Sequence, residues 1–123
     1  MTGKEVLDQA MSLLGYTDSD GHLNSQTSRP VWQRALFVIN QIYRDLWYVT
    51  SDKTFTPLSH IGESVHLPER AAGDAIPYGV AMLLAQGEGD NHNQSLFAEL
   101  YNRKRAALTV TDTRQDVLPS IEG

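Results

Sequence analysis

The residues of this chain that come closest to a metal-binding motif are Asp18-Ser19-Asp20-Gly21. Two aspartates ahead of a glycine are typical of the start of a calcium-binding loop. An EF-hand also needs a further oxygen ligand before its glycine and a glutamate at its twelfth position. Counted from Asp18, that position is Arg29. We therefore interpret the stretch as a turn, because aspartate, serine and glycine all favour turns.

The histidines form no recognisable metal or catalytic pattern. They are His22, His60, His66 and His92. None lies at the close spacing of a zinc site, and the sequence has no HExxH. His60 and His66 could meet across a hairpin, but surface positions are the simpler interpretation. The sequence thus predicts no metal site.

Glu88 and Asp90 place two carboxylates close together. Paired carboxylates act as acid and base only in a pocket that separates their pKa values. We instead expect Asp90 to cap a following helix. The chain has no GxSxG, P-loop or GxGxxG motif, and no cysteine for a nucleophile, a thiolate ligand or a disulfide. We predict that it is not an enzyme and needs no cofactor.

The charge balance bears on nucleic acid as a partner. Ten basic residues stand against fifteen acidic ones, for a formal net charge of −5. A free nucleic-acid binder is usually basic, because phosphate neutralisation supplies most of its non-specific affinity. The one dense basic group is Arg103-Lys104-Arg105. It fits a solvated helix end, where cations suit the helix dipole, or a contact with an acidic partner or a DNA backbone.

The length of 123 residues suits one domain, with no apolar run near the roughly 20 residues that cross a bilayer. We expect no membrane contact and no signal peptide, and therefore a cytoplasm-like setting. Thr2 and Glu5 form a capping-box pattern ahead of a helix at 3–14, and Gly15 is a natural stop. The polar residues 16–28 indicate a loop.

Arg29-Pro30 opens the strongest helical pattern, with Pro30 in the first turn and an end near Val49. Its aromatic residues, with Phe97, are expected in the core, or one of them at a subunit interface. These residues are Trp32, Tyr43, Trp47 and Phe97.

The residues after Val49 differ in pattern from the helix before them. Residues 54–68 contain short extended stretches that favour a small β-hairpin or an extended arm, and 69–73 indicates a loop. A third helix, apolar almost all round and therefore buried, follows a cap at Asp74. Its small residues Gly79, Ala81 and Ala85 would allow close helix contact.

A fourth helix is expected at about 91–108. Residues 109–123 show no periodic pattern, and we expect an extended tail that orders on a partner. The predicted fold is mostly α: a four-helix bundle-like domain over residues 1–108, with a small β-hairpin or extended arm between the second and third helices.

The order of these segments resembles the head–tail connector (adaptor, or head-completion) proteins of tailed bacteriophages, including prophage-encoded ones. The likeness covers roughly residues 3–108, and its most suggestive part is the Ile-Pro-Tyr-Gly helix start followed by a Gly-Asp junction. The segments that carry it are Leu13-Leu14-Gly15-Tyr16-Thr17-Asp18, Ala35 to Leu46, Val65-His66-Leu67-Pro68, Ala75-Ile76-Pro77-Tyr78-Gly79-Val80-Ala81, Gly89-Asp90 and Phe97-Ala98-Glu99-Leu100-Tyr101-Asn102.

The resemblance implies a structural virion protein of the phage neck, assembled in the cytoplasm of the bacterial host. Such proteins form a homo-oligomeric ring, typically a dodecamer, beneath the portal, and link the capsid to a downstream neck or tail protein. DNA passes through the ring, and a net acidic charge suits a channel that must not hold it. The family has no catalytic residues to carry over.

A ring needs a heterologous contact that closes on rotation. The extended 54–68 segment and the tail could supply it, with 103–105 and the tail on the portal side. The alternatives are another phage neck, tail-completion or DNA-packaging protein, or a small host regulator or enzyme. Candidate portal or subunit contacts are Phe55, Leu58, Val65, Leu67, Arg103, Lys104, Arg105, Val117 and Leu118.

Overall fold

The structure is a computed structural model that describes residues 1–15 and 25–122, with side chains for 1–15 and 34–108. These residues contain no β-strand, and a single isolated bridge joins Thr2 to Ser64. The expected mostly α, bundle-like fold is confirmed. The helices are α1 (Gly3–Leu14), α2 (Ser25–Thr50), α3 (Glu69–Asp74), α4 (Ile76–Gly87) and α5 (Asn91–Glu122).

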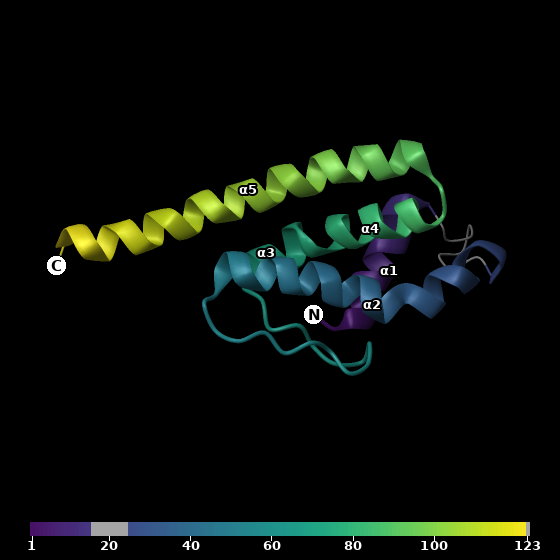
Figure 1. Ribbon diagram of the computed structural model, residues 1–123, viewed down its shortest axis with the longest axis horizontal. Coiled ribbons are helices and arrows are strands. Elements are labelled where there is room, and N and C mark those ends of the chain that lie inside the picture. The colour runs from purple at the N-terminus through teal and green to yellow at the C-terminus, as the bar shows by residue number, and fades with distance from the viewer. Residues whose placement is uncertain (16–24, 123) are drawn as a thin grey trace.

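Helix α4 occupies the middle of the bundle and packs against α1, α2 and α5 (Figure 1). Ile76, Val80 and Leu84 are fully buried, as expected for a helix that is apolar almost all round. Gly79 brings three helices together. A Cβ at this position would lie 2.7 Å from Ile42 Cγ2 of α2 and 2.7 Å from Tyr101 Cε1 of α5. The expected close contact through small residues is therefore present.

Helix α1 begins and ends where its sequence predicts. The Thr2 hydroxyl accepts a hydrogen bond from the Glu5 N–H at 3.1 Å, and the Glu5 carboxylate accepts one from the Thr2 N–H at 3.1 Å. Gly15 ends the helix with a left-handed φ of 75°. Residues Val6, Leu7 and Met11 then face the core with no exposed surface.

Helix α2 begins at Ser25, four residues before the predicted start, and ends at Thr50. Polar residues such as those at 25–28 cost a helix end less than about 1 kcal/mol each, so they do not stop it. Pro30 accordingly lies beyond the first turn. The remainder of the predicted loop, with the Asp18–Gly21 turn and His22, lies outside the described residues. Tyr43 is buried as expected, whereas Trp47 is half-buried and donates from its Nε1 to the Lys53 carbonyl at 2.7 Å.

The segment between α2 and α3 is an extended arm and not a β-hairpin. Its backbone pairs with the amino terminus: the Val65 N–H donates to the Met1 carbonyl at 2.8 Å, and the Lys4 N–H donates to the Ile61 carbonyl at 2.7 Å. The prolines in this segment lack the N–H that a second hairpin strand would need. Figure 1 shows this arm running out below α2 and doubling back to α3 as two irregular lengths of chain.

Two side chains of α2 fix this arm. The Asn40 amide donates to the Leu58 carbonyl at 3.0 Å and accepts from the Leu58 N–H at 2.8 Å. The Tyr43 hydroxyl accepts from the His66 N–H at 2.9 Å. Backbone polar groups that would otherwise be unpaired are thereby satisfied beside the core.

The loop predicted at 69–73 is instead the short helix α3, which includes Asp74. Helix α4 then has Ala75 at its amino-terminal boundary, with no side-chain cap, so the predicted cap at Asp74 is wrong. Burial accounts for the difference, because Ala71 and Ala72 of α3 are packed in the core. This tertiary contact outweighs the turn preference of Gly73 and Asp74.

Helix α5 is capped as predicted, since the Asp90 carboxylate accepts from the Asn93 N–H at 3.2 Å. It does not end near Leu108. The helix continues to Glu122, so the tail expected to be extended at 109–123 is helical as far as residue 122. No glycine or proline occurs between Asn91 and Leu118, so no helix breaker precedes Pro119, which lies in the last turn of the helix. The final part of α5 runs beyond the other helices (Figure 1).

Candidate functional site

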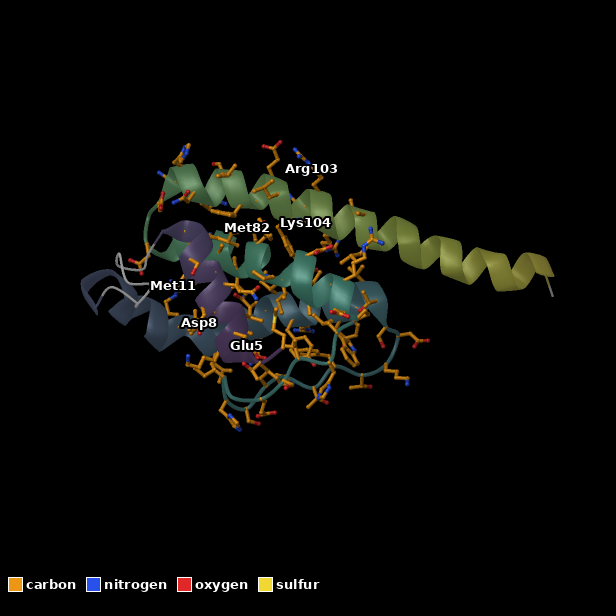
Figure 2. All side chains as sticks on the ribbon, turned by 180° about the vertical axis from the view of Figure 1, so that it is seen from behind. Glu5, Asp8, Met11, Met82, Arg103 and Lys104 are labelled. Atoms are coloured by element: carbon orange, nitrogen blue, oxygen red, sulfur yellow. The ribbon has the colours of Figure 1, made fainter. Side chains whose placement is uncertain are left out.

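The basic cluster at 103–105 is divided among three directions. Successive residues of an α-helix point about 100° apart, so three neighbours cannot share one face. Arg103 lies on the outer side of α5 and pairs with Glu99 at 2.8 Å, whereas Lys104 turns towards α4 (Figure 2). The Lys104 ammonium lies 4.7 Å from the ring centroid of Tyr78.

Arg105, the third member of the cluster, points inward and joins α5 to α2. Its Nε donates to Asp45 Oδ2 at 2.7 Å, and a terminal nitrogen donates to Asp45 Oδ1 at 3.1 Å. The Tyr101 hydroxyl donates to the same carboxylate at 2.5 Å. Burial, with the hydrogen bond to Asp45, raises the pKa of Tyr101 well above its usual range. Arg105 therefore has a structural role, and only Arg103 and Lys104 remain as candidate contacts.

A small basic pocket lies between α3 and α5. Arg70 of α3 joins Arg103 and Lys104 there, with Asp74 as the carboxylate of the lining and a cavity of about 230 Å³. Sequence reasoning missed Arg70, because it lies in a stretch expected to be a loop and is far from 103–105 along the chain. The pocket offers cations to an acidic partner or to a phosphate.

The candidate contacts in the extended arm are placed unequally. Leu58 and Val65 are buried in the domain's own core, with exposed fractions of 5% and 6%, so their side chains offer no surface to a partner. Phe55 and Leu67 are half-buried and remain accessible. Val117 and Leu118 belong to the far part of α5, and their side chains lie outside those described.

An apolar groove on the outer side of α2 was not predicted. Phe37, Gln41, Arg44 and Tyr48 follow one side of the helix, and the arm residues Phe55 and Pro57 face them across a groove of about 390 Å³. Phe37 and Tyr48 are 67% and 53% exposed. Their spacing of eleven residues is a helical repeat that could have shown this second face. The stronger core stripe along the same helix concealed it.

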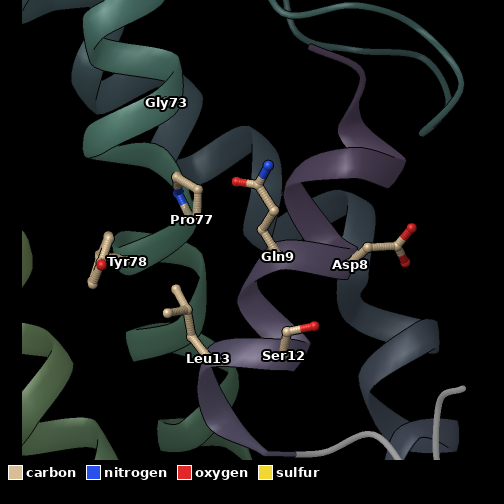
Figure 3. A pocket seen from close by; sticks show the side chains of 7 residues that line it. All are labelled: Asp8, Gln9, Ser12, Leu13, Gly73, Pro77 and Tyr78. Atoms are coloured by element: carbon tan, nitrogen blue, oxygen red, sulfur yellow. The ribbon is translucent and has the colours of Figure 1, made fainter. Parts of the chain in front are cut away.

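A second groove of about 480 Å³ lies between α1 and the α3–α4 junction (Figure 3). Gln9, Leu13, Pro77 and Tyr78 contribute to its lining. Asp8, the one carboxylate of the lining, turns away from α4 and pairs with Lys4 at 3.1 Å. The groove therefore presents a mainly apolar surface with the Gln9 amide and the Ser12 hydroxyl, and its lining does not converge ionisable groups on a common point.

The histidines expected at the surface are exposed where the structure describes them. His60 lies 3.7 Å from Glu63, and His66 is held through its backbone. The Glu63 carboxylate accepts from the Ser59 N–H at 2.7 Å, and this bond lowers the pKa of Glu63. Within residues 1–15 and 34–108, no three histidine or carboxylate side chains are grouped so that they could hold a metal ion.

Comparison with known proteins adds no relative. A scan of protein-family models, a search of curated proteins and a search of solved structures each found no match to this chain. Among the described residues, no helix combines the length and apolar character needed to cross a bilayer.

Proposed function

We propose that this chain is a structural head–tail connector of a tailed bacteriophage or prophage. In this proposal copies of the chain form a ring, of twelve in the virion, beneath the portal and carry the next neck or tail protein. The ring lines the path of the DNA and does not hold it. The sequence resemblance described above supplies the class of protein.

The observation that carries the proposal is the shape of α5. The helix packs against α4 through Phe97 and Tyr101 and then continues past Leu108 with no other helix of the domain beside it (Figure 1). A helix of this length that leaves its own domain is stabilised only weakly by propensity and gains most from packing on a partner. A helix end that projects in this way is suited to a protein that functions by assembling with partners.

Surface apolar groups also support an assembly role. The grooves on α2 and beside α1 place Phe37, Tyr48 and Leu13 at the surface, with exposed fractions of 67%, 53% and 40%. Exposed aromatic residues in grooves are typical of contact sites between proteins. The basic pocket of Arg70, Arg103 and Lys104 lies where α5 leaves the bundle, and we propose that this end of the molecule contacts the portal.

The experiment is reconstitution with the portal protein of the phage or prophage genome that encodes this chain, followed by electron microscopy and sedimentation. We expect added density in the form of a ring on one end of the portal. The charge reversal Arg103→Glu should weaken the binding, and Lys4→Glu is its matched control. Both residues form exposed i,i+4 ion pairs, Arg103 with Glu99 and Lys4 with Asp8, but Lys4 lies on α1. Failure of the unaltered chain to bind the portal would refute the proposal.

A second candidate function is a DNA-packaging subunit, which the same basic pocket favours. Such a protein would bind duplex DNA with an affinity that falls steeply as salt increases. Fluorescence anisotropy with a labelled duplex at two salt concentrations separates the two. The connector should show weak binding, in line with its net charge of −5.

A further inference from the structure

One side of α2 carries a preformed groove that the core does not use. Phe37, Gln41, Arg44 and Tyr48 are spaced by four, three and four residues, which places them along one face of the helix. All four are exposed. The opposite face of the same helix, with Ile39 and Leu46, is fully buried. Helix α2 therefore buries one apolar face in the core and exposes further apolar residues on its outer side.

The far wall of this groove is held rigidly. The arm residue Phe55 packs edge-on against Tyr43 with ring centroids 5.0 Å apart, and its N–H donates to the Tyr48 hydroxyl at 3.4 Å. Two hydrogen bonds between Asn40 and the Leu58 backbone anchor the arm just beyond Pro57. A partner would thus meet a groove that needs little rearrangement, which lowers the entropic cost of binding.

Arg44 is the one charged side chain in the lining of this groove. Among the described side chains it has no hydrogen bond or ion pair, unlike Arg103 and Arg105. A guanidinium between aromatic rings prefers a carboxylate, which it can bind through two parallel hydrogen bonds. The groove therefore suits an apolar segment that also carries acidic residues.

The chain itself contains a segment of this composition in a helix that leaves the bundle. Beyond Leu108, α5 continues to Glu122, a distance of roughly 20 Å. The sequence of residues 109–122 has four aliphatic residues and an excess of carboxylates over its one arginine. The aliphatic residues are Val110, Val117, Leu118 and Ile121, and the charged residues are Asp112, Arg114, Asp116 and Glu122.

This segment cannot reach the groove of its own chain, because it continues as one helix away from the bundle (Figure 1). A second copy can receive it. We infer that the groove between Phe37 and Tyr48 of one copy binds the α5 segment 109–122 of the next copy. The binding of a helix that carries apolar side chains in an apolar groove is a common mode of recognition. A contact between two different surfaces is heterologous, and it closes into a ring when the rotation between copies permits.

This inference rests on the proposed function, in which copies of the chain assemble, and it specifies which two surfaces of the chain meet. The absence of cysteine makes it directly testable, because introduced cysteines are then unique. In the full chain, Gln41→Cys combined with Asp116→Cys should give a ladder of covalent oligomers with a short bismaleimide, both alone and on the portal. The matched control combines Asp116→Cys with Glu99→Cys, an exposed site on α5. A ladder of equal strength from the control, or none from the test pair, would overturn the inference.

A charge exchange provides a second test. Arg44→Glu reverses the charge of the groove, and Asp112→Arg with Asp116→Arg reverses the charge of the α5 segment 109–122. Each variant alone should therefore associate at least about tenfold more weakly. An equal mixture should recover association, because each unaltered surface then finds its unaltered partner and the two reversed surfaces also match. Sedimentation measures the association, and circular dichroism checks that both variants are folded.

The outcomes separate this inference from the proposed function. If both charge variants associate and bind the portal as the unaltered chain does, the groove is not the interface and the connector function stands. If the unaltered chain assembles neither alone nor on the portal, both proposals fall. If the mixture recovers association but the chain never binds a portal, the interface stands and the connector function falls.

Discussion

Gly79→Ala should destabilise the protein, although alanine is the better helix former. The added methyl group would lie 2.7 Å from Ile42 Cγ2 and 2.7 Å from Tyr101 Cε1, distances at which carbon atoms repel strongly. Neither neighbour can move easily. Ile42 is 4% exposed in α2, and Tyr101 is 3% exposed in α5 and hydrogen-bonded to Asp45. The substitution must therefore separate helices that now touch.

The size of the effect follows from two opposing contributions. Overpacking a well-filled core costs about 1–3 kcal/mol. Replacing glycine by alanine inside a helix contributes roughly 1 kcal/mol in the opposite direction. Because both neighbours are buried in different helices, we place the cost near its upper end. The expected net loss is about 1–2 kcal/mol, or a decrease in Tm of roughly 3–10 °C for a domain of this size.

The matched control is Gly73→Ala in α3. No atom lies within 4 Å of a Cβ at Gly73, and its φ is not positive. Its substitution should stabilise the protein by about 0.5–1 kcal/mol through helix propensity and lost freedom of the unfolded chain. Urea denaturation followed at 222 nm measures both variants. The reasoning is wrong if Gly79→Ala proves as stable as Gly73→Ala, because no tight junction of helices could then exist.

Three further predictions concern hydrogen bonds. Thr2→Ala removes the capping box with Glu5 and should cost about 1 kcal/mol in the free energy of unfolding, whereas Thr2→Ser should restore most of it. Asn40→Ala leaves both polar groups of the Leu58 backbone unpaired and should lower the free energy of unfolding by about 1–3 kcal/mol. Asn40→Asp should have an intermediate stability because it keeps the acceptor. Equal stability of both variants and the unaltered chain would contradict this role. The raised pKa of Tyr101 stabilises the fold fully below a pH of about 10, where unfolded tyrosine ionises, and this contribution is lost as the pH rises further. Urea denaturation between pH 8 and 11 should thus show a steeper loss of stability for the unaltered chain than for Tyr101→Phe, and parallel curves would refute the assignment.

The features that the sequence predicted well depend on neighbouring residues. The capping box of Thr2 and Glu5, the left-handed stop at Gly15 and the cap at Asp90 each involve residues within a few positions of one another. The buried character of α4 was equally clear, because a helix that is apolar on every side has no alternative to burial. The helical fold class followed from these local signals.

The features that the sequence missed depend on distant contacts or on the absence of a signal. Helix α3 forms because Ala71 and Ala72 pack in a core that other helices build. The extension of α5 has no apolar repeat to mark it, yet no glycine or proline interrupts it before Pro119, so the helix continues. The groove on α2 needs the arm residue Phe55 as its second wall, and that arm is placed by contacts between distant residues, such as the bonds of Asn40 to Leu58 and of Tyr43 to His66. Candidate contacts at Leu58 and Val65 were unsuitable for the same reason, since the arm turns them inward.

The hydrogen bonds of Tyr101 and Arg105 to Asp45 anchor α5 to α2 close to the point where α5 leaves the bundle. The free part of the helix begins after the buried Leu108 and extends by roughly 20 Å. A load at the tip therefore reaches the buried Leu108 and then Asp45, which lies beside Arg44 on α2. Pulling on the carboxyl end of a subunit should thus strain α2, the helix that carries the outer groove, through the contact of Tyr101 and Arg105 with Asp45.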